Sequence, residues 1–104
     1  ISYHLFKYQK WNERFFRECY QAYLEERAEK DPSLGWYEGE LGFFDFYIIP
    51  LAKKLKECRV FGVASDEYLN YAEANRREWK DKGRDIVAGY LKRSTVINRL
   101  KAAA

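Results

Sequence analysis

Histidine and cysteine are scarce in this chain, which holds one His, two Cys and no Met among 104 residues. A two-metal hydrolase site needs several His and Asp side chains around ions about 4 Å apart. The single histidine, His4, cannot supply that set, and a surface or partly buried position explains it better than a ligand role. Cys19 and Cys58 are too far apart for a Cys-x-x-Cys site and too few for a disulfide framework. These shortages exclude a complete metal site and a disulfide scaffold, and they favour a reducing compartment.

Long apolar runs and targeting signals are lacking too. The longest apolar run, Phe46 to Ala52, is about seven residues long, whereas a membrane helix needs roughly 18. No basic-then-apolar signal peptide opens the chain. We therefore expect no membrane contact by this segment. Because the chain opens abruptly at Ile1 without an initiating Met, we also expect a further segment upstream of it.

Charge of one sign is not concentrated anywhere. The net charge is +3, and Lys, Arg, Asp and Glu are interleaved along the chain. This pattern is typical of solvated helix faces and creates no strong steering field. We therefore expect no nucleic-acid partner.

Apolar and aromatic side chains are abundant, at 47% and 18% of the sequence, which is enough for the core of one domain. Between about Phe6 and Glu29 they recur at helical spacing, which predicts a first helix. The recurring positions are Tyr8, Trp11, Phe15, Cys19 and Tyr23. A turn should follow over Asp31-Pro32-Ser33-Leu34-Gly35, because proline disfavours helix for the residue before it.

A second helix is predicted from about Glu40 to Glu57, bent at Pro50, which removes one backbone donor. Its apolar stripe comprises Leu41, Phe44, Ile48, Leu51 and Leu55. Residues 59–64 are interpreted as a packed connector, since one short strand would have no partner.

A third helix should begin at Ser65 as N-cap and end near Lys82-Gly83, where glycine favours termination. Its inner face would carry Tyr68, Ala72, Asn75 and Trp79. A fourth helix should begin at Arg84. The sequence thus predicts one all-α unit of about four helices.

Three motifs carry a resemblance to a known family. They are Trp11-Asn12-Glu13-Arg14, the run from Gly39 to Leu51 (GELGFFDFYIIPL), and Asn75-Arg76-Arg77-Glu78-Trp79. From about Tyr8 to Arg84 the chain resembles the C-terminal third of the catalytic domain of the class I 3',5'-cyclic nucleotide phosphodiesterases. It looks most like members from unicellular eukaryotes, in which such domains often end large chains that also carry a membrane span and a cyclase domain.

The resemblance implies that residues 1–104 are the C-terminal part of an all-α catalytic-domain bundle whose metal-binding part lies upstream. The intact domain would hydrolyse cyclic AMP or cyclic GMP with two divalent metal ions, zinc plus magnesium or manganese. None would be bound by this segment, which should be inactive alone. Ile1-Ser2 match the pair after the family's last metal-binding Asp, although Tyr3-His4 replace the usual Asn-Pro.

The resemblance also implies a purine site. Phe43 matches the aromatic clamp that stacks on the base, and Glu40 stands where most members have a Gln at the purine edge. The positions that line or support the pocket match Tyr8, Trp11, Asn12, Phe15 and Phe16. With the metal-bearing helices missing, we expect Trp11, Phe15, Phe43 and Tyr47 to be partly exposed.

Glu40 favours guanine, because an ionised carboxylate only accepts hydrogen bonds. Guanine offers two adjacent donors, whereas adenine offers one donor beside an acceptor. We therefore expect cyclic GMP to be preferred over cyclic AMP.

Simpler interpretations remain open for each of these residues. Glu40 can be a first-turn residue that stabilises its helix N-terminus, and the aromatic residues can be core. Asp45, inside an apolar helix, is best explained by an ion pair with Arg14 or Arg76. The whole chain can also be a helical protein-interaction module without a ligand. As part of a phosphodiesterase it would be cytoplasmic, or the cytosolic domain of a membrane-anchored parent.

Overall fold

The computed structural model describes residues 3–58 and 64–103, with side chains from Lys7 and, after the gap, from Asp66. This part of the chain is helical and contains no strand, so the predicted all-α class is confirmed. Its helices are α1 (Tyr3–Leu24), α2 (Trp36–Phe43), α3 (Ile49–Glu57) and α4 (Ala64–Ala103). Ser65, the predicted N-cap, lies inside α4, and residues 59–63 of the predicted connector lie outside the described part.

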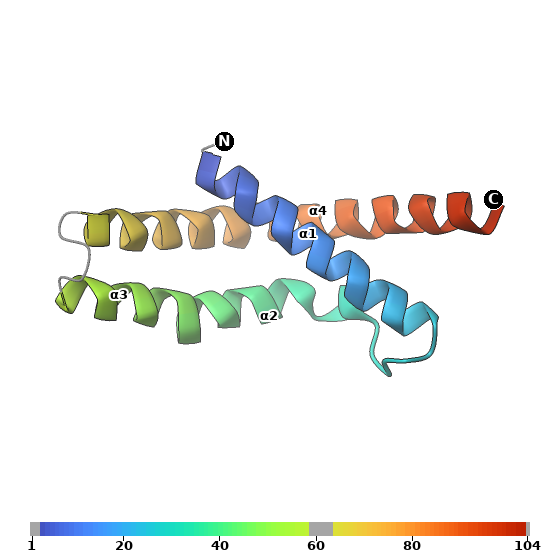
Figure 1. Cartoon of the computed structure of the whole chain (residues 1–104), viewed down its shortest axis with the longest axis horizontal. Helices are drawn as coiled ribbons and strands as arrows, with labels where there is room; N and C mark the ends of the chain where they lie inside the picture. The colour runs from blue at the N-terminus through green and yellow to red at the C-terminus, as the bar shows by residue number, and fades with distance from the viewer. Residues whose placement is uncertain (1–2, 59–63, 104) are drawn as a thin grey trace.

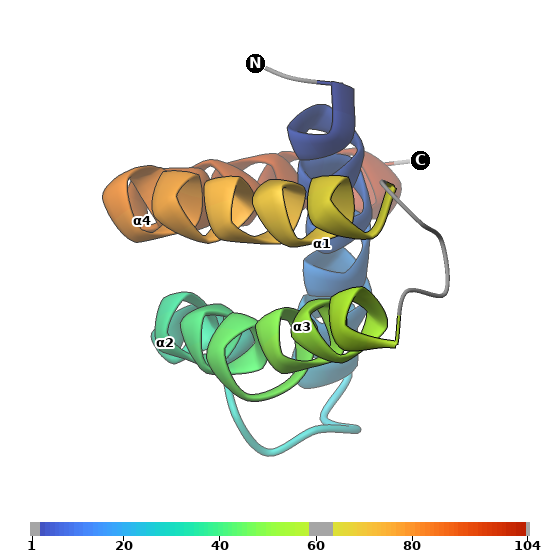
Figure 2. The same ribbon diagram turned by 90° about the vertical axis from the view of Figure 1, so that its left-hand side faces the viewer.

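The helices form an antiparallel hairpin crossed by α1. A π-helical turn, Phe44–Ile48, joins α2 and α3 into one continuous rod, which lies beside the first half of α4 (Figure 1). α1 crosses this pair, as the perpendicular view shows (Figure 2). α4 contacts each of the other helices, so it is the element on which the fold is assembled.

The first helix ends at Leu24, five residues before the expected end at Glu29. Its last turn closes with Glu26 N–H donating to Tyr23 O (3.1 Å) and Arg27 N–H to Ala22 O (2.9 Å). This is the Schellman pattern, which needs a left-handed residue, and Glu26 adopts it with φ 61°. Because glycine usually occupies this place, the sequence carried no stop signal there.

The predicted turn after α1 is confirmed. Asp31 is extended (φ −68°, ψ 115°), as expected for a residue before proline. Its carboxylate accepts from Ser33 N–H (2.9 Å) and from the Ser33 hydroxyl (2.7 Å), which caps a short 3₁₀ turn, Pro32–Leu34. This turn redirects the chain into α2.

The rod begins at Trp36, four residues before the predicted Glu40, and Pro50 does not simply bend it. The N–H of Ile49 donates to Phe44 O, five residues back, so the helix widens just before the proline. The extra residue in this turn also shifts by one position the residues of α3 that face α4. Consequently Ala52 is buried, whereas Leu51, predicted to be inward, is 61% exposed.

Gly83 does not end a helix, and the predicted third and fourth helices are one helix, α4. Gly83 is buried, and a Cβ built on it would lie 2.7 Å from Tyr37 Cδ2 and 3.0 Å from the Trp79 ring. Glycine is therefore required for the close approach of α2 to α4. Packing overrides its low helix propensity, which costs about 1 kcal/mol relative to alanine.

The core joins one aromatic residue of α1, one of the π-helical turn and several of α4. Its buried members are Phe16, Phe44, Trp79, Val87 and Tyr90. Trp79 Nε1–H donates to Tyr37 O (3.0 Å), and the Tyr90 hydroxyl to Gln9 O (3.2 Å). On the expected inner face of α4, Ala72 and Trp79 are buried as predicted, but Tyr68 is 46% exposed.

Among the charged pairs that join the helices at the surface, two form more than one hydrogen bond each. Asp45 pairs with Arg76, one of its two predicted partners, at 2.5 and 3.1 Å. Glu13 on α1 accepts three hydrogen bonds from Arg93 on α4, at 2.6 to 3.1 Å. The Arg93 guanidinium holds the pKa of the Glu13 carboxyl below its ordinary range.

Candidate functional site

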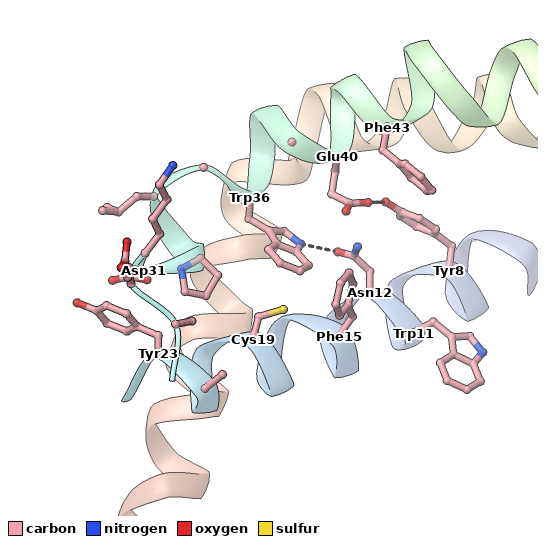
Figure 3. A pocket seen from close by; sticks show the side chains of 18 residues that line it. Tyr8, Trp11, Asn12, Phe15, Cys19, Tyr23, Asp31, Trp36, Glu40 and Phe43 are labelled. Carbon is pink, nitrogen blue, oxygen red and sulfur yellow. Dashed lines mark hydrogen bonds between the residues drawn. The ribbon is translucent and has the colours of Figure 1, made fainter. Parts of the chain in front are cut away.

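An open groove of about 1300 Å³ lies between α1, α2 and the loop that joins them. It brings together six of the seven residues predicted for the purine site, from two helices: Tyr8, Trp11, Asn12, Phe15, Glu40 and Phe43. Figure 3 shows Glu40 and Phe43 on α2 facing Tyr8 and Asn12 on α1, while the Trp11 ring points away from α2.

Phe16 does not belong to this groove. Its side chain is fully buried, with ring centroids 5.2 Å from Trp36 and 5.6 Å from Tyr90. Successive residues of a helix are turned about 100° apart, so Phe15 faces the groove while Phe16 faces the core. Phe16 therefore does not line the groove but packs behind it against Trp36, in the core position that was the simpler interpretation.

Glu40 is held by a partner on the facing helix. The hydroxyl of Tyr8 donates to Glu40 Oε2 across the groove. Burial, and then the nearby Glu40 carboxylate, raise the pKa of Tyr8 far above its ordinary value, so this hydroxyl remains a donor at all physiological pH values. Because α2 begins at Trp36, Glu40 lies beyond the first turn, and the helix-start interpretation of Glu40 is wrong.

Phe43 follows Glu40 by three residues, about one turn, and its ring is 49% exposed at the groove. It is therefore not a core residue. The ring centroid of Tyr47 lies 5.6 Å away. Trp11, Phe15 and Tyr47 are 60% to 68% exposed, which confirms the expected exposure of this aromatic stripe.

Asn12 is 6% exposed and forms part of the groove wall. Its Oδ1 accepts from the indole N–H of Trp36 at 3.0 Å, which joins α1 to the first residue of α2. Sequence reasoning missed Trp36 because the helix was predicted to begin at Glu40. Once α2 starts at Trp36, the spacing of four residues places Trp36 and Glu40 on one face.

The far end of the groove was also missed. It is formed by residues of the last turns of α1 and of the following loop, among them Cys19, Tyr23, Pro32 and Leu34. Burial raises the pKa of the Cys19 thiol, so this cysteine is not activated as a nucleophile. The far end is thus a mainly apolar extension of the groove.

Metal ligands do not gather in residues 3–58 and 64–103, where no group of three His, Cys, Asp or Glu side chains could hold an ion. Ile1-Ser2 and the side chain of His4 lie outside the described residues and side chains. Within the same ranges, no helix combines the length and apolarity that crossing a bilayer requires.

Comparison of the chain with family models, curated proteins and solved structures gives no match.

Proposed function

We propose that this chain is the purine-binding wall of a cyclic nucleotide phosphodiesterase, the C-terminal part of its catalytic domain. The intact enzyme would hydrolyse 3',5'-cyclic nucleotides to 5'-monophosphates in signal transduction. One observation carries the proposal. Glu40 and Phe43, the pair that resembles the family's purine-recognising Gln and Phe, lie one turn apart on α2 and line the same groove.

Phe43 supplies the stacking surface. Its half-exposed ring stands at the groove, beside the hydrogen-bonded Tyr8–Glu40 pair. Stacking of a base on an aromatic ring contributes about 1–3 kcal/mol. A ring next to a polar group suits a purine, which offers an apolar face and a hydrogen-bonding edge.

Glu40 supplies the polar contact to the base. Tyr8 donates to one carboxylate oxygen, Oε2, and no other group among the described residues donates to Oε1, which can accept from a ligand. An acceptor facing the base favours guanine N1–H over adenine N1, which is itself an acceptor. Cyclic GMP is therefore the preferred nucleotide in this proposal.

The metal chemistry belongs to the upstream part of the same catalytic domain, which is the expected partner of this chain. Two divalent ions, zinc plus magnesium or manganese, would supply an activated hydroxide there. The described residues offer no ligand set for them. This chain contributes binding and orientation of the base, and the exposed Trp11 and Phe15 are surfaces for the missing helices to cover. Its two free cysteines accord with a cytosolic location.

A second candidate function is that of a helical protein-interaction module. It is favoured by exposed apolar side chains that do not line the groove, Phe46 (78%) and Leu51 (61%). Such side chains on one rod can anchor a partner protein.

Titration of the chain with cyclic GMP, followed by NMR, distinguishes the two functions. The proposal expects shifts at Phe43 and Glu40, and a loss of about tenfold or more in affinity for Phe43→Ala. Phe46→Ala is the matched control, since this ring is more exposed but lies outside the groove. Absence of shifts at the groove, or equal effects of the two substitutions, would refute purine binding and leave the interaction module.

A further inference from the structure

The orientation of the Asn12 amide is fixed by chemistry. An indole N–H can only donate, so the atom of Asn12 that faces Trp36 must be the amide oxygen. The 3.0 Å bond from Trp36 Nε1 to Asn12 Oδ1 has this arrangement. The amide nitrogen, with its two donor hydrogens, consequently faces away from Trp36.

The Asn12 nitrogen is available to a ligand. In the part of the chain that the structure describes, Nδ2 of Asn12 donates to no protein group. Among the described residues, the fully buried side-chain atoms without a partner are Arg17 Nε and Ser94 Oγ. Because Nδ2 of Asn12 is not one of them, part of its surface is accessible. Asn12 lines the groove, and Figure 3 shows its amide between the Trp36 indole and the Glu40 carboxylate.

The groove therefore presents two complementary polar atoms from facing helices. Glu40 Oε1 is an acceptor, since Tyr8 binds the other oxygen, and Asn12 Nδ2 is a donor. A 6-oxopurine carries the matching pair on adjacent atoms, the acceptor O6 and the donor N1–H. Adenine has the reverse order, a donor amine beside the acceptor N1, so the same pose would place like groups against each other.

We propose that Asn12 is a specificity-determining residue that donates to O6 of a 6-oxopurine nucleotide while Glu40 accepts from N1–H. Trp36 is a positioning residue, because it acts only by holding the Asn12 amide in this orientation. The inference rests on the proposed purine site. It adds that the 2-amino group of guanine is not needed, so cyclic IMP should bind about as well as cyclic GMP.

The test is an NMR titration of the ¹⁵N-labelled chain with three probes, cyclic GMP, cyclic IMP and cyclic AMP. The first two should shift the Asn12 side-chain amide and bind within a few-fold of each other. Cyclic AMP should bind about tenfold more weakly, the size expected for one hydrogen bond made or lost. Tight binding of cyclic GMP with weak binding of cyclic IMP would overturn the inference, because it would assign recognition to the 2-amino group.

Substitutions separate a specific role from a structural one. Trp36→Phe keeps an aromatic ring but removes the N–H, and should reduce the preference over cyclic AMP. Asn12→Asp keeps an acceptor for Trp36 but replaces the donor NH₂ with a second acceptor oxygen. This change should abolish or invert the preference over cyclic AMP. Asn12→Ala should reduce the preference to the part that Glu40 alone provides, whereas Asn70→Ala, at an exposed asparagine on α4, should leave it unchanged.

The outcomes also separate this inference from the proposed function. If no nucleotide shifts Phe43 or Glu40, both are refuted. If nucleotides shift Phe43 but the preference survives both Asn12→Asp and Trp36→Phe, the purine site stands and the role of Asn12 is refuted. In each variant, an unshifted indole N–H resonance of buried Trp79, which donates to Tyr37 O, would show that the fold is retained.

Discussion

The contact at Gly83 allows a prediction whose sign is opposite to the usual expectation for a helical glycine. Gly83→Ala in the middle of α4 would normally stabilise by about 1 kcal/mol, because alanine is the better helix former. Here the added methyl would lie 2.7 Å from Tyr37 Cδ2 and 3.0 Å from Cδ2 and Cε2 of Trp79. At these distances, one of the two rings must move.

Neither ring can move without losing other interactions. Trp79 is fully buried and donates to Tyr37 O, and the Tyr37 hydroxyl donates to Lys80 O at 2.7 Å. Overpacking of a filled site costs about 1–3 kcal/mol. Set against the gain in helix propensity, Gly83→Ala should destabilise the fold by up to about 2 kcal/mol.

The assay is equilibrium unfolding in urea, followed by tryptophan fluorescence. Gly39→Ala in α2 is the matched control, because a Cβ there meets nothing within 4 Å. It should stabilise by about 1 kcal/mol. If Gly83→Ala stabilised the chain as much as Gly39→Ala does, the close approach of Tyr37 to α4 would be refuted.

Three further predictions concern the core, the groove and the α1–α4 contact. Trp79→Ala should cost about 3–5 kcal/mol of stability in a thermal melt, because it empties a fully buried site; an unchanged melt would show that Trp79 is not buried. In the intact phosphodiesterase that we propose, Glu40→Gln should relax the proposed preference for cyclic GMP, since an amide can present either polarity to the base. Comparison of kcat/KM on both nucleotides checks this, and a ratio indifferent to the change would place Glu40 away from the base. The depressed pKa of Glu13 means that its pairing with Arg93 stabilises the fold above the ordinary Glu pKa of about 4.3 and is lost as pH falls through the folded value. Melts from pH 6 downward should therefore fall less steeply for Glu13→Gln than for the native chain, and parallel curves would contradict it.

The helical class could be predicted because apolar residues recur every three to four positions, a local property of the sequence. The burial of Trp79 was predictable for the same reason, and the turn at Asp31-Pro32 because proline disfavours helix for the residue before it. Helix ends were not. After α1, Glu26 adopts a left-handed conformation that glycine usually takes. Gly83, which was predicted to end a helix, lies inside α4, where the Tyr37 ring leaves no room for a larger side chain.

The candidate site shows the same limit. Six residues chosen from the motifs, namely Glu40, Phe43 and four residues of α1, do line one groove. They could be predicted because the faces of a helix recur at a regular spacing. The sequence left open whether Phe16 lines the pocket or belongs to the core, since neighbouring residues face different sides and only the packing of α4 decides which side is the core. Trp36 was missed because the helix was predicted to begin at Glu40, and its hydrogen bond to Asn12, 24 residues away, leaves no local signal in the sequence.

The π-helical turn Phe44–Ile48 changes the rotational register between α2 and α3, the two halves of one rod. The angular setting of α2 decides where Glu40 and Phe43 point, and that of α3 decides which side chains meet α4. In an uninterrupted α-helix these two settings would be locked together at about 100° per residue. The extra residue decouples them, because it moves the inward position of α3 from Leu51 to Ala52. Deletion of Phe46 should therefore restore a regular α-helix in which Ala52 still faces α4. The residues of α2 that line the groove and the residues of α3 that pack on α4 are thus set independently by one inserted residue between them.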